Sequence, residues 1–254
     1  MKALKLTGLV WLAVLAVAIP TFSGAQEKKD AQQAPRGESQ PKAPTTTVAV
    51  PTYKPPLRGA PGGRVGGGTR GSGREVFVLT VLAPDHSALT VSEQPFLYWF
   101  ISSATSLPIE VTVMDLRTTL PVLEARLAAP MTAGVHRIRL ADHGVRLEPG
   151  VPYRWFVTIV PDSNRRSKDI LAGGAIERVE PPEGLAAKLA QARKEATPSL
   201  YAEAGVWYEA LAAISELIES APAPNDAVLR KQRATLLAQV GLPTVGEDGA
   251  GTSR

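Results

Sequence analysis

Short segments of alternating apolar and polar residues occupy the middle of the chain. The pattern is clearest over residues 109–115 and 152–160, where every second position is hydrophobic. A period of two is typical of a β-strand with one buried face. Turn-forming residues such as Pro149 and Gly150 separate these segments, and no helical pattern lies between them. We therefore expect strands at the following places: residues 76–82, 95–101, 109–115, 136–140, 152–160 and 170–179.

Helix-forming residues take over after Pro181 and Pro182. Their periodicity predicts helices over residues 183–195, 199–220 and 225–240, with Gly241 ending the third. Strands followed by helices indicate an α+β protein. We expect an antiparallel immunoglobulin- or fibronectin-like β-sandwich over residues 76–180 and a three-helix region over residues 183–242 that packs on it. Residues 243–254 have the composition of a flexible tail.

The second helical stretch carries the spacing of a tetratricopeptide repeat. The matching positions are Tyr201, Gly205, Trp207, residues 209–211 and Pro222. Pro198 departs from the pattern, and the chain has no second repeat. A single repeat-like hairpin has no neighbouring repeat to cover its apolar face. We therefore expect it to dock on the sandwich, with Trp207 at the junction and the adjacent Tyr208 more exposed.

The first 25 residues have the three parts of a secretory signal peptide. Lys2 and Lys5 precede an uncharged run over residues 6–19, and small residues at 23–25 offer a cleavage site. The alternative is a membrane anchor, but spanning a bilayer takes roughly 20 apolar residues. We expect cleavage, a periplasmic or secreted protein, and no transmembrane segment afterwards. The absence of cysteine excludes lipoprotein processing, disulfides and thiolate metal sites.

The net charge of +4 is unevenly distributed. Residues 26–75 hold nine Lys or Arg and four Asp or Glu, whereas the rest of the mature chain is slightly acidic. Residues 26–56 are rich in Pro, Lys and Gln, which predicts a disordered arm, and residues 57–75 are rich in Gly and Arg. A basic arm suits anionic lipid, wall polymer or nucleic acid, or it is simply a solvated linker. We favour the linker and expect no nucleic-acid partner.

The glycine-rich segment contains a spacing that resembles a nucleotide-binding motif. Gly66, Gly68 and Gly71 satisfy G-x-G-x-x-G, but no strand precedes them and no helix begins there. A phosphate-binding P-loop also fails, because Gly68 stands where its lysine would be. We expect no nucleotide and no other cofactor.

Four sequence blocks together resemble the bacterial family called domain of unknown function 928 (DUF928). The blocks are residues 58–71, 95–100, 147–156 and 201–211, and the resemblance spans about residues 57–242. Ala175 stands where an aromatic residue would be expected after Gly174. The resemblance implies an exported β-rich domain with a helical end. It implies no activity and no catalytic residue.

Known catalytic and metal-binding patterns are absent from the sequence. The three histidines, His86, His136 and His143, have no partner at ligand spacing, and no G-x-S-x-G motif is present. The enzyme alternative is a carboxylate-dependent hydrolase, which would use a spaced pair of carboxylates from different strands. Glu110 and Asp115 lie on or beside a single alternating strand, where a solvated face explains them. We expect no enzymatic activity and no metal site.

The remaining candidates are contact residues. Arg165, Arg166 and Lys168 form a basic loop that could bind an anion. Aromatic side chains could form a sugar-stacking platform or fill the core; they are Tyr98, Trp99 and Trp155, with Tyr208 as a further contact candidate. The leading hypothesis is a non-enzymatic interaction or adaptor module of the cell envelope with a protein partner. The alternative is a sandwich that binds glycan or wall polymer.

Overall fold

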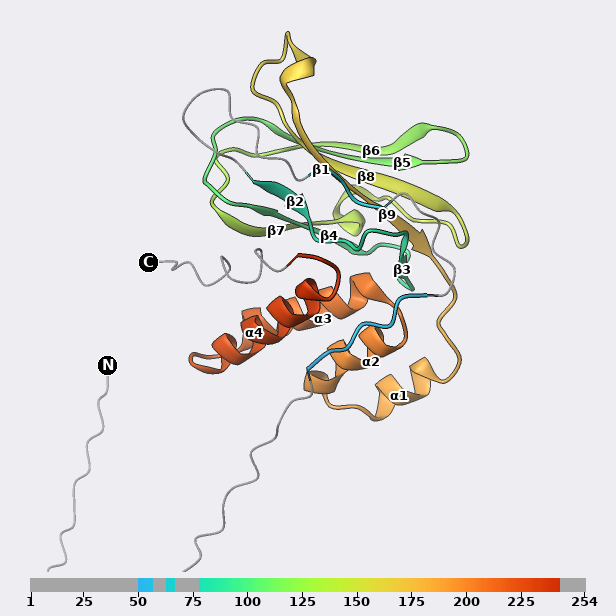
Figure 1. Ribbon diagram of the computed structural model, residues 1–254. Helices are drawn as coiled ribbons and strands as arrows, with labels where there is room; N and C mark the ends of the chain where they lie inside the picture. Colours follow the sequence, from blue (N-terminus) through green and yellow to red (C-terminus); the bar gives the residue numbers. More distant parts are fainter. Residues whose placement is uncertain (1–49, 57–62, 67–77, 243–254) are drawn as a thin grey trace, which may run out of the picture. The chain divides into compact units, whose positions relative to one another are not determined.

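The computed structural model describes residues 50–56, 63–66 and 78–242 (Figure 1). The expected signal peptide, the arm up to residue 49 and the tail over residues 243–254 lie outside the described residues. The chain is α+β, with antiparallel β-sheets followed by C-terminal helices.

The larger sheet has six strands. Its order is β1-β9-β8-β5-β6, with β3 beside β9; the strands are β1 (Val65–Gly66), β3 (Ala88–Thr90), β5 (Ile109–Asp115), β6 (Leu120–Leu127), β8 (Pro152–Ile159) and β9 (Ile170–Arg178). The smaller sheet has the order β2-β4-β7, and its strands are β2 (Leu79–Val81), β4 (Phe96–Ile101) and β7 (Gly134–Arg139). Neighbouring strands are antiparallel except for β3 and β9, which run parallel. The sheets are therefore antiparallel as expected, apart from this one parallel pair.

The alternating segments of the sequence became strands with one buried face. In β5 the buried positions alternate with half-buried ones along the whole strand, from Ile109 to Asp115. Trp155 in β8 and Trp99 in β4 have no exposed surface. Three strands were not expected from the sequence: β1, β3 and β6. The first two have only two and three residues, and β6 carries a proline and two charged residues in its eight positions.

The helices are α1 (Leu185–Gln191), α2 (Thr197–Glu203), α3 (Trp207–Ser220) and α4 (Asn225–Ala238). The single helix expected over residues 199–220 is wrong, because the chain breaks between α2 and α3. Gly205 lies at the break with a φ of +76°, in the left-handed region that glycine adopts without strain. A Cβ at this position would lie 2.9 Å from the Lys54 carbonyl oxygen, so the close approach of another segment also requires glycine.

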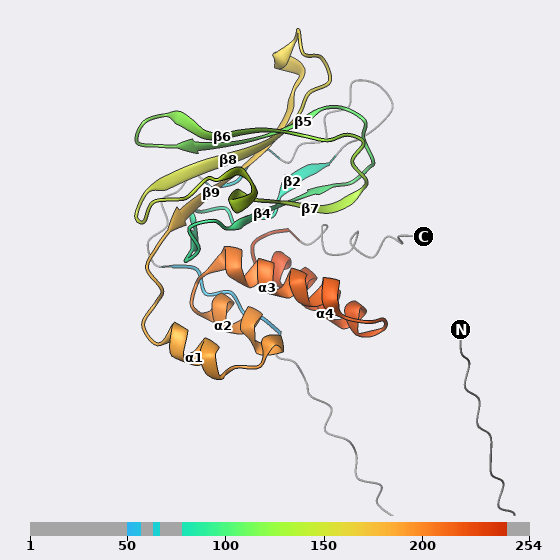
Figure 2. The same cartoon turned by 180° about the vertical axis from the view of Figure 1, so that it is seen from behind.

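The helices pack against the sheets through α3 (Figures 1 and 2). The indole N–H of Trp207 donates to the Leu82 carbonyl oxygen at 2.9 Å. The next residue, Tyr208, contacts the other sheet: its hydroxyl accepts from the Trp155 indole N–H at 2.9 Å and donates to the Ala175 carbonyl oxygen at 3.0 Å. Side chains from both sheets and from α2, α3 and α4 share one hydrophobic core.

The last residues of the expected disordered arm also join this core. Tyr53 is buried, and its ring packs edge-on against Trp207. The Tyr53 N–H donates to the Gln239 side chain in the turn after α4, and the Lys54 N–H donates to the Ala202 carbonyl oxygen. The prediction of a disordered arm is therefore wrong for residues 50–56, which pack against the helices (Figure 1).

The described part of the glycine-rich segment adds an edge strand. Val65 and Gly66 form β1, which pairs antiparallel with β9. Gly66 has a φ of +79°, and a Cβ there would lie 2.0 Å from the Leu171 carbonyl oxygen. Glycine at this position therefore allows β1 to lie close enough to β9 to pair with it. Gly68 and Gly71 of the motif lie outside the described residues.

Candidate functional site

The aromatic residues considered for a sugar-stacking platform are buried. Tyr98, Trp99 and Trp155 each expose at most 2% of their surface. Stacking on a sugar requires an exposed ring face, so these three residues form the core and not a platform.

Tyr208 is also buried, which corrects the expectation that one of the two adjacent aromatics on α3 would be exposed. Trp207 and Tyr208 expose 0% and 1% of their surface. Helical geometry does separate the two side chains by about 100°, but α3 has packing partners on more than one side. Trp207 contacts the loop after β2 and Tyr208 contacts β8 and β9.

The basic loop is exposed, but its arginines face carboxylates. Arg166 forms ion pairs with Glu110 at 2.5 Å and with Asp169 at 2.9 Å, and Arg165 lies 3.5 Å from Asp162. Lys168 is exposed and forms no ion pair with any described residue. An incoming anion would therefore have to compete with these carboxylates for the arginines.

The two carboxylates at the ends of β5 do not form a catalytic pair. Glu110 and Asp115 lie five residues apart on β5, so alternation places them on opposite faces of the sheet. Arg166 lowers the pKa of Glu110 by hydrogen bonding, and Arg117 lowers the pKa of Asp115 in the same way. Both side chains are therefore held as carboxylates at neutral pH, and neither suits the role of a general acid.

Two of the three histidines have structural partners. His86 Nε2 lies 2.9 Å from the Tyr53 hydroxyl, and His136 Nε2 lies 2.7 Å from the Thr132 carbonyl oxygen. Within the described residues, no group of three metal-ligating side chains comes together. None of the described helices is both long enough and apolar enough to cross a membrane.

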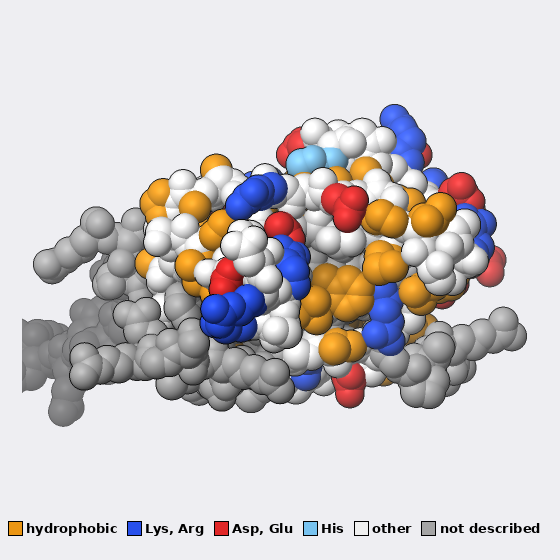
Figure 3. Space-filling model, turned by 90° about the horizontal axis from the view of Figure 1, so that it is seen from above, with side chains coloured by type: hydrophobic (Ala, Val, Ile, Leu, Met, Phe, Trp, Pro, Cys, Tyr) orange, Lys and Arg blue, Asp and Glu red, His pale blue; other side chains and the backbone are white. Residues whose placement is uncertain are grey.

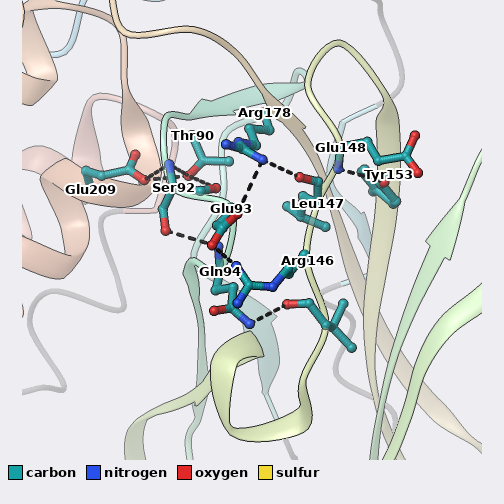
Figure 4. Close-up of polar contacts among 11 residues, drawn as sticks. Thr90, Ser92, Glu93, Gln94, Arg146, Leu147, Glu148, Tyr153, Arg178 and Glu209 are labelled. Carbon is teal, nitrogen blue, oxygen red and sulfur yellow. Dashed lines mark hydrogen bonds and ion pairs between the residues drawn. The ribbon is translucent and has the colours of Figure 1, made fainter.

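A polar cluster ties α3 to the loop between β3 and β4 (Figure 4). Glu209, in the first turn of α3, accepts hydrogen bonds from the Thr90 hydroxyl at 2.5 Å and from the Ser92 N–H at 3.0 Å. Its other oxygen is buried and has no hydrogen-bond partner in the described structure. Burial raises the pKa of Glu209, because removing the carboxylate from water disfavours its charged form.

The same loop contacts the segment before β8. Glu93 pairs with Arg146, and Arg178 lies 3.8 Å from the second oxygen of Glu93 and donates to the Leu147 carbonyl oxygen at 2.9 Å. The Gln94 side chain donates to the Val145 carbonyl oxygen at 3.0 Å. These contacts connect α3, the β3–β4 loop and β9 (Figure 4). Sequence reasoning missed the cluster; its one signal was an acidic residue on the apolar first turn of α3.

Exposed hydrophobic side chains gather on the six-stranded sheet. Of the seven large hydrophobic residues that the described structure exposes, five lie on this sheet or in its β5–β6 turn: Val65, Leu116, Leu120, Val122 and Leu171. Val65 and Leu171 share the outer face of the sheet with the half-buried Phe156, which lies opposite Gly173 and covers it. Leu120 lies opposite Asp115, at the end of the strand pair. We call these five residues and Phe156 the apolar sheet surface. Figure 3 looks down on this side and shows hydrophobic side chains between basic and acidic ones.

The described architecture defines the class of protein: an α+β domain whose antiparallel sheets are joined by C-terminal helices through one core. The family model for the Domain of Unknown Function (DUF928) matches residues 65–249, which is most of the chain. The protein therefore belongs to the DUF928 family, as its sequence blocks indicated. Comparison with curated proteins gives no match.

Proposed function

We propose that this protein is a non-enzymatic interaction module of the cell envelope that binds another protein through the apolar sheet surface. The grouping of five exposed hydrophobic residues on one sheet is the observation that carries the proposal. Single exposed hydrophobic residues are ordinary on any protein, whereas a group of them on one sheet is typical of a contact surface. The N-terminal segment supports a location outside the cytoplasm, because residues 1–25 have the pattern of a cleaved signal peptide.

We interpret the two sheets as an immunoglobulin- or fibronectin-like sandwich and α2 with α3 as one tetratricopeptide-like hairpin. The hairpin interpretation rests on the repeat spacing, on the turn at Gly205 and on the small buried Ala210 in α3. The buried Trp207 fills the position of the large interior aromatic. In this interpretation the sheets take the place of a second repeat.

No specific observation now favours the two alternatives. Tyr98, Trp99 and Trp155, which motivated glycan binding, are buried. Glu110 and Asp115 lie on opposite faces of a strand and pair with arginines, so they do not form the carboxylate pair of a hydrolase. The apolar sheet surface suits a protein partner better than a glycan, because its exposed side chains are aliphatic.

Affinity purification of the exported protein from its own envelope fraction tests the proposal. Two variants, Leu116→Glu and Leu171→Glu, each place a charge on the apolar sheet surface. Val228→Glu is the matched control, because Val228 is also an exposed hydrophobic side chain, 60% accessible against 42% for Leu116 and 40% for Leu171, but lies on α4. Thermal unfolding checks that all three variants remain folded.

The wild type and Val228→Glu should recover the same envelope protein, and the two sheet variants should recover much less of it. Recovery of nothing above background from the wild type would count against an interaction module. Equal recovery by all four proteins would show that the partner binds elsewhere.

A further inference from the structure

Strand β6 is an uncovered edge of the six-stranded sheet. It pairs with β5 on one side, and no described strand pairs with its other side (Figures 1 and 2). An edge strand presents unpaired backbone N–H and C=O groups, which can pair with another chain. The edge is therefore a place where a second sheet could be added.

The regular part of β6 comprises residues 123–127. The pairing with β5 skips Val122, because Met114 lies opposite Pro121 while Val113 lies opposite Leu123. From Leu123 onward the register is continuous to Leu127. Pro121, which cannot donate a backbone hydrogen bond, falls outside this regular part.

The side chains of the regular part alternate between the two faces. Leu123 and Ala125 are buried on the inner face, whereas Glu124 and Arg126 are exposed on the outer face. Neither Glu124 nor Arg126 forms an ion pair with a described residue. An exposed strand thus carries one acidic and one basic side chain, two positions apart, on the same face.

We propose that two copies of this chain pair through β6, antiparallel and centred on Ala125. In this arrangement Ala125 lies opposite Ala125 of the second copy, and Leu123 lies opposite Leu127 of the second copy on the inner face. Glu124 lies opposite Arg126 of the second copy, and the two-fold axis creates the same ion pair a second time. The result is one continuous sheet across the dimer. This inference does not depend on the apolar sheet surface or its partner.

Charge selects this register over its neighbours. Centring the pairing on Glu124 would set two glutamates opposite each other, and centring it on Arg126 would set two arginines opposite each other. A shift by a single position would bring inward-facing residues opposite outward-facing ones. Only the register centred on Ala125 places both charges opposite a charge of the other sign and keeps each face continuous.

Charged residues and proline on an edge strand also serve in other proteins to prevent edge pairing. Here the proline lies outside the regular part, and the two charges are of opposite sign. The neighbouring Leu120 and Val122 are exposed hydrophobic residues on the same strand. If Pro121 and the two charges prevented edge pairing here too, the protein would be a monomer, and a monomer would overturn the proposal.

Sedimentation velocity of the purified exported protein, over a range of protein concentrations, measures the association. The variants are Glu124→Arg, Arg126→Glu and the double swap with both changes. Lys231→Glu on α4 is the control, because it reverses an exposed charge away from the sheets.

The wild type and the control should form a dimer. Each single variant should weaken dimerisation by about tenfold or more, because two attractive cross-strand pairs become repulsive. The double swap should restore dimerisation, since it exchanges the two signs without changing the pairing.

A wild type that stays monomeric at every concentration overturns the proposal. So does a dimer that both single variants form as readily as the wild type, because the interface would then lie elsewhere. A double swap that stays monomeric although each single variant is folded contradicts the register centred on Ala125.

Discussion

The hydroxyl of Tyr208 joins the helices to the larger sheet, and its removal is the sharpest test of that junction. It accepts from the Trp155 indole N–H at 2.9 Å and donates to the Ala175 carbonyl oxygen at 3.0 Å. The ring is 1% exposed. Tyr208→Phe deletes only the hydroxyl and retains the buried ring, so the hydrophobic contribution stays almost unchanged.

The expected cost follows from the two groups that lose their partner. The Trp155 N–H and the Ala175 carbonyl are both inside the core, and an unsatisfied buried polar group costs about 1–3 kcal/mol. We expect Tyr208→Phe to lower the free energy of unfolding by about 2–4 kcal/mol, a substantial part of the roughly 5–15 kcal/mol that holds a typical domain together.

Equilibrium unfolding in urea measures this loss, with tryptophan fluorescence and far-ultraviolet circular dichroism as two probes. Tyr201→Phe is the matched control, because Tyr201 lies on α2, is half-buried and has no hydroxyl hydrogen bond within the described structure. A Tyr208→Phe protein as stable as Tyr201→Phe would refute the reasoning. Two separate transitions in the wild type would show that helices and sheets unfold independently.

Three further perturbations follow from the same structure. Burial raises the pKa of Glu209 above 4.5, so the folded protein binds the carboxyl proton of Glu209 more tightly than the unfolded chain does. Protonation of Glu209 therefore stabilises the folded protein at low pH, and this contribution is lost as the pH rises through the folded-state pKa. Glu209→Gln should therefore have a higher melting temperature than the wild type at neutral pH and a similar melting temperature in acid. A difference in melting temperature that stays the same from acid to neutral pH would refute this. Gly66→Ala should destabilise more than Gly144→Ala, because both glycines have positive φ but only Gly66 meets backbone, and equal melting temperatures would contradict this. Trp207→Ala should lower the free energy of unfolding by about 3–5 kcal/mol, in a single urea transition. A Trp207→Ala variant as stable as the wild type would refute the burial of Trp207.

The strands with strict alternation were predictable from the sequence, and β5 was expected at its observed bounds, Ile109–Asp115. Strand β6 was not predictable, because its sequence contains a proline and two charged residues, Pro121, Glu124 and Arg126, and shows no regular alternation. Its strand conformation depends on pairing with β5. The break at Gly205 was also missed, since an isolated glycine inside a helical pattern is compatible with a continuous helix. Its reason is the approach of residues 50–56, which no local pattern reveals.

The candidate site was less predictable than the fold. Exposed and buried aromatics have the same sequence signature, so Tyr98, Trp99, Trp155 and Tyr208 could be assigned to the core only from the packing of sheets and helices. The basic loop was correctly placed between two strands. Two of the carboxylates that face its arginines, Asp162 and Asp169, lie in the loop itself, but the third, Glu110, comes from β5, far away in the sequence. The raised pKa of Glu209 likewise depends on burial by the β3–β4 loop, which is a tertiary effect.

Site-specific photo-crosslinking in living cells tests the proposed interaction surface most directly. A photoreactive amino acid replaces Leu171 or Leu116 on the apolar sheet surface, or Val228 on α4, in the exported protein. The proposal predicts an adduct with another envelope protein from both sheet positions and none from position 228. Adducts of equal yield from all three positions, or no adduct from either sheet position, would contradict an interaction through the apolar sheet surface.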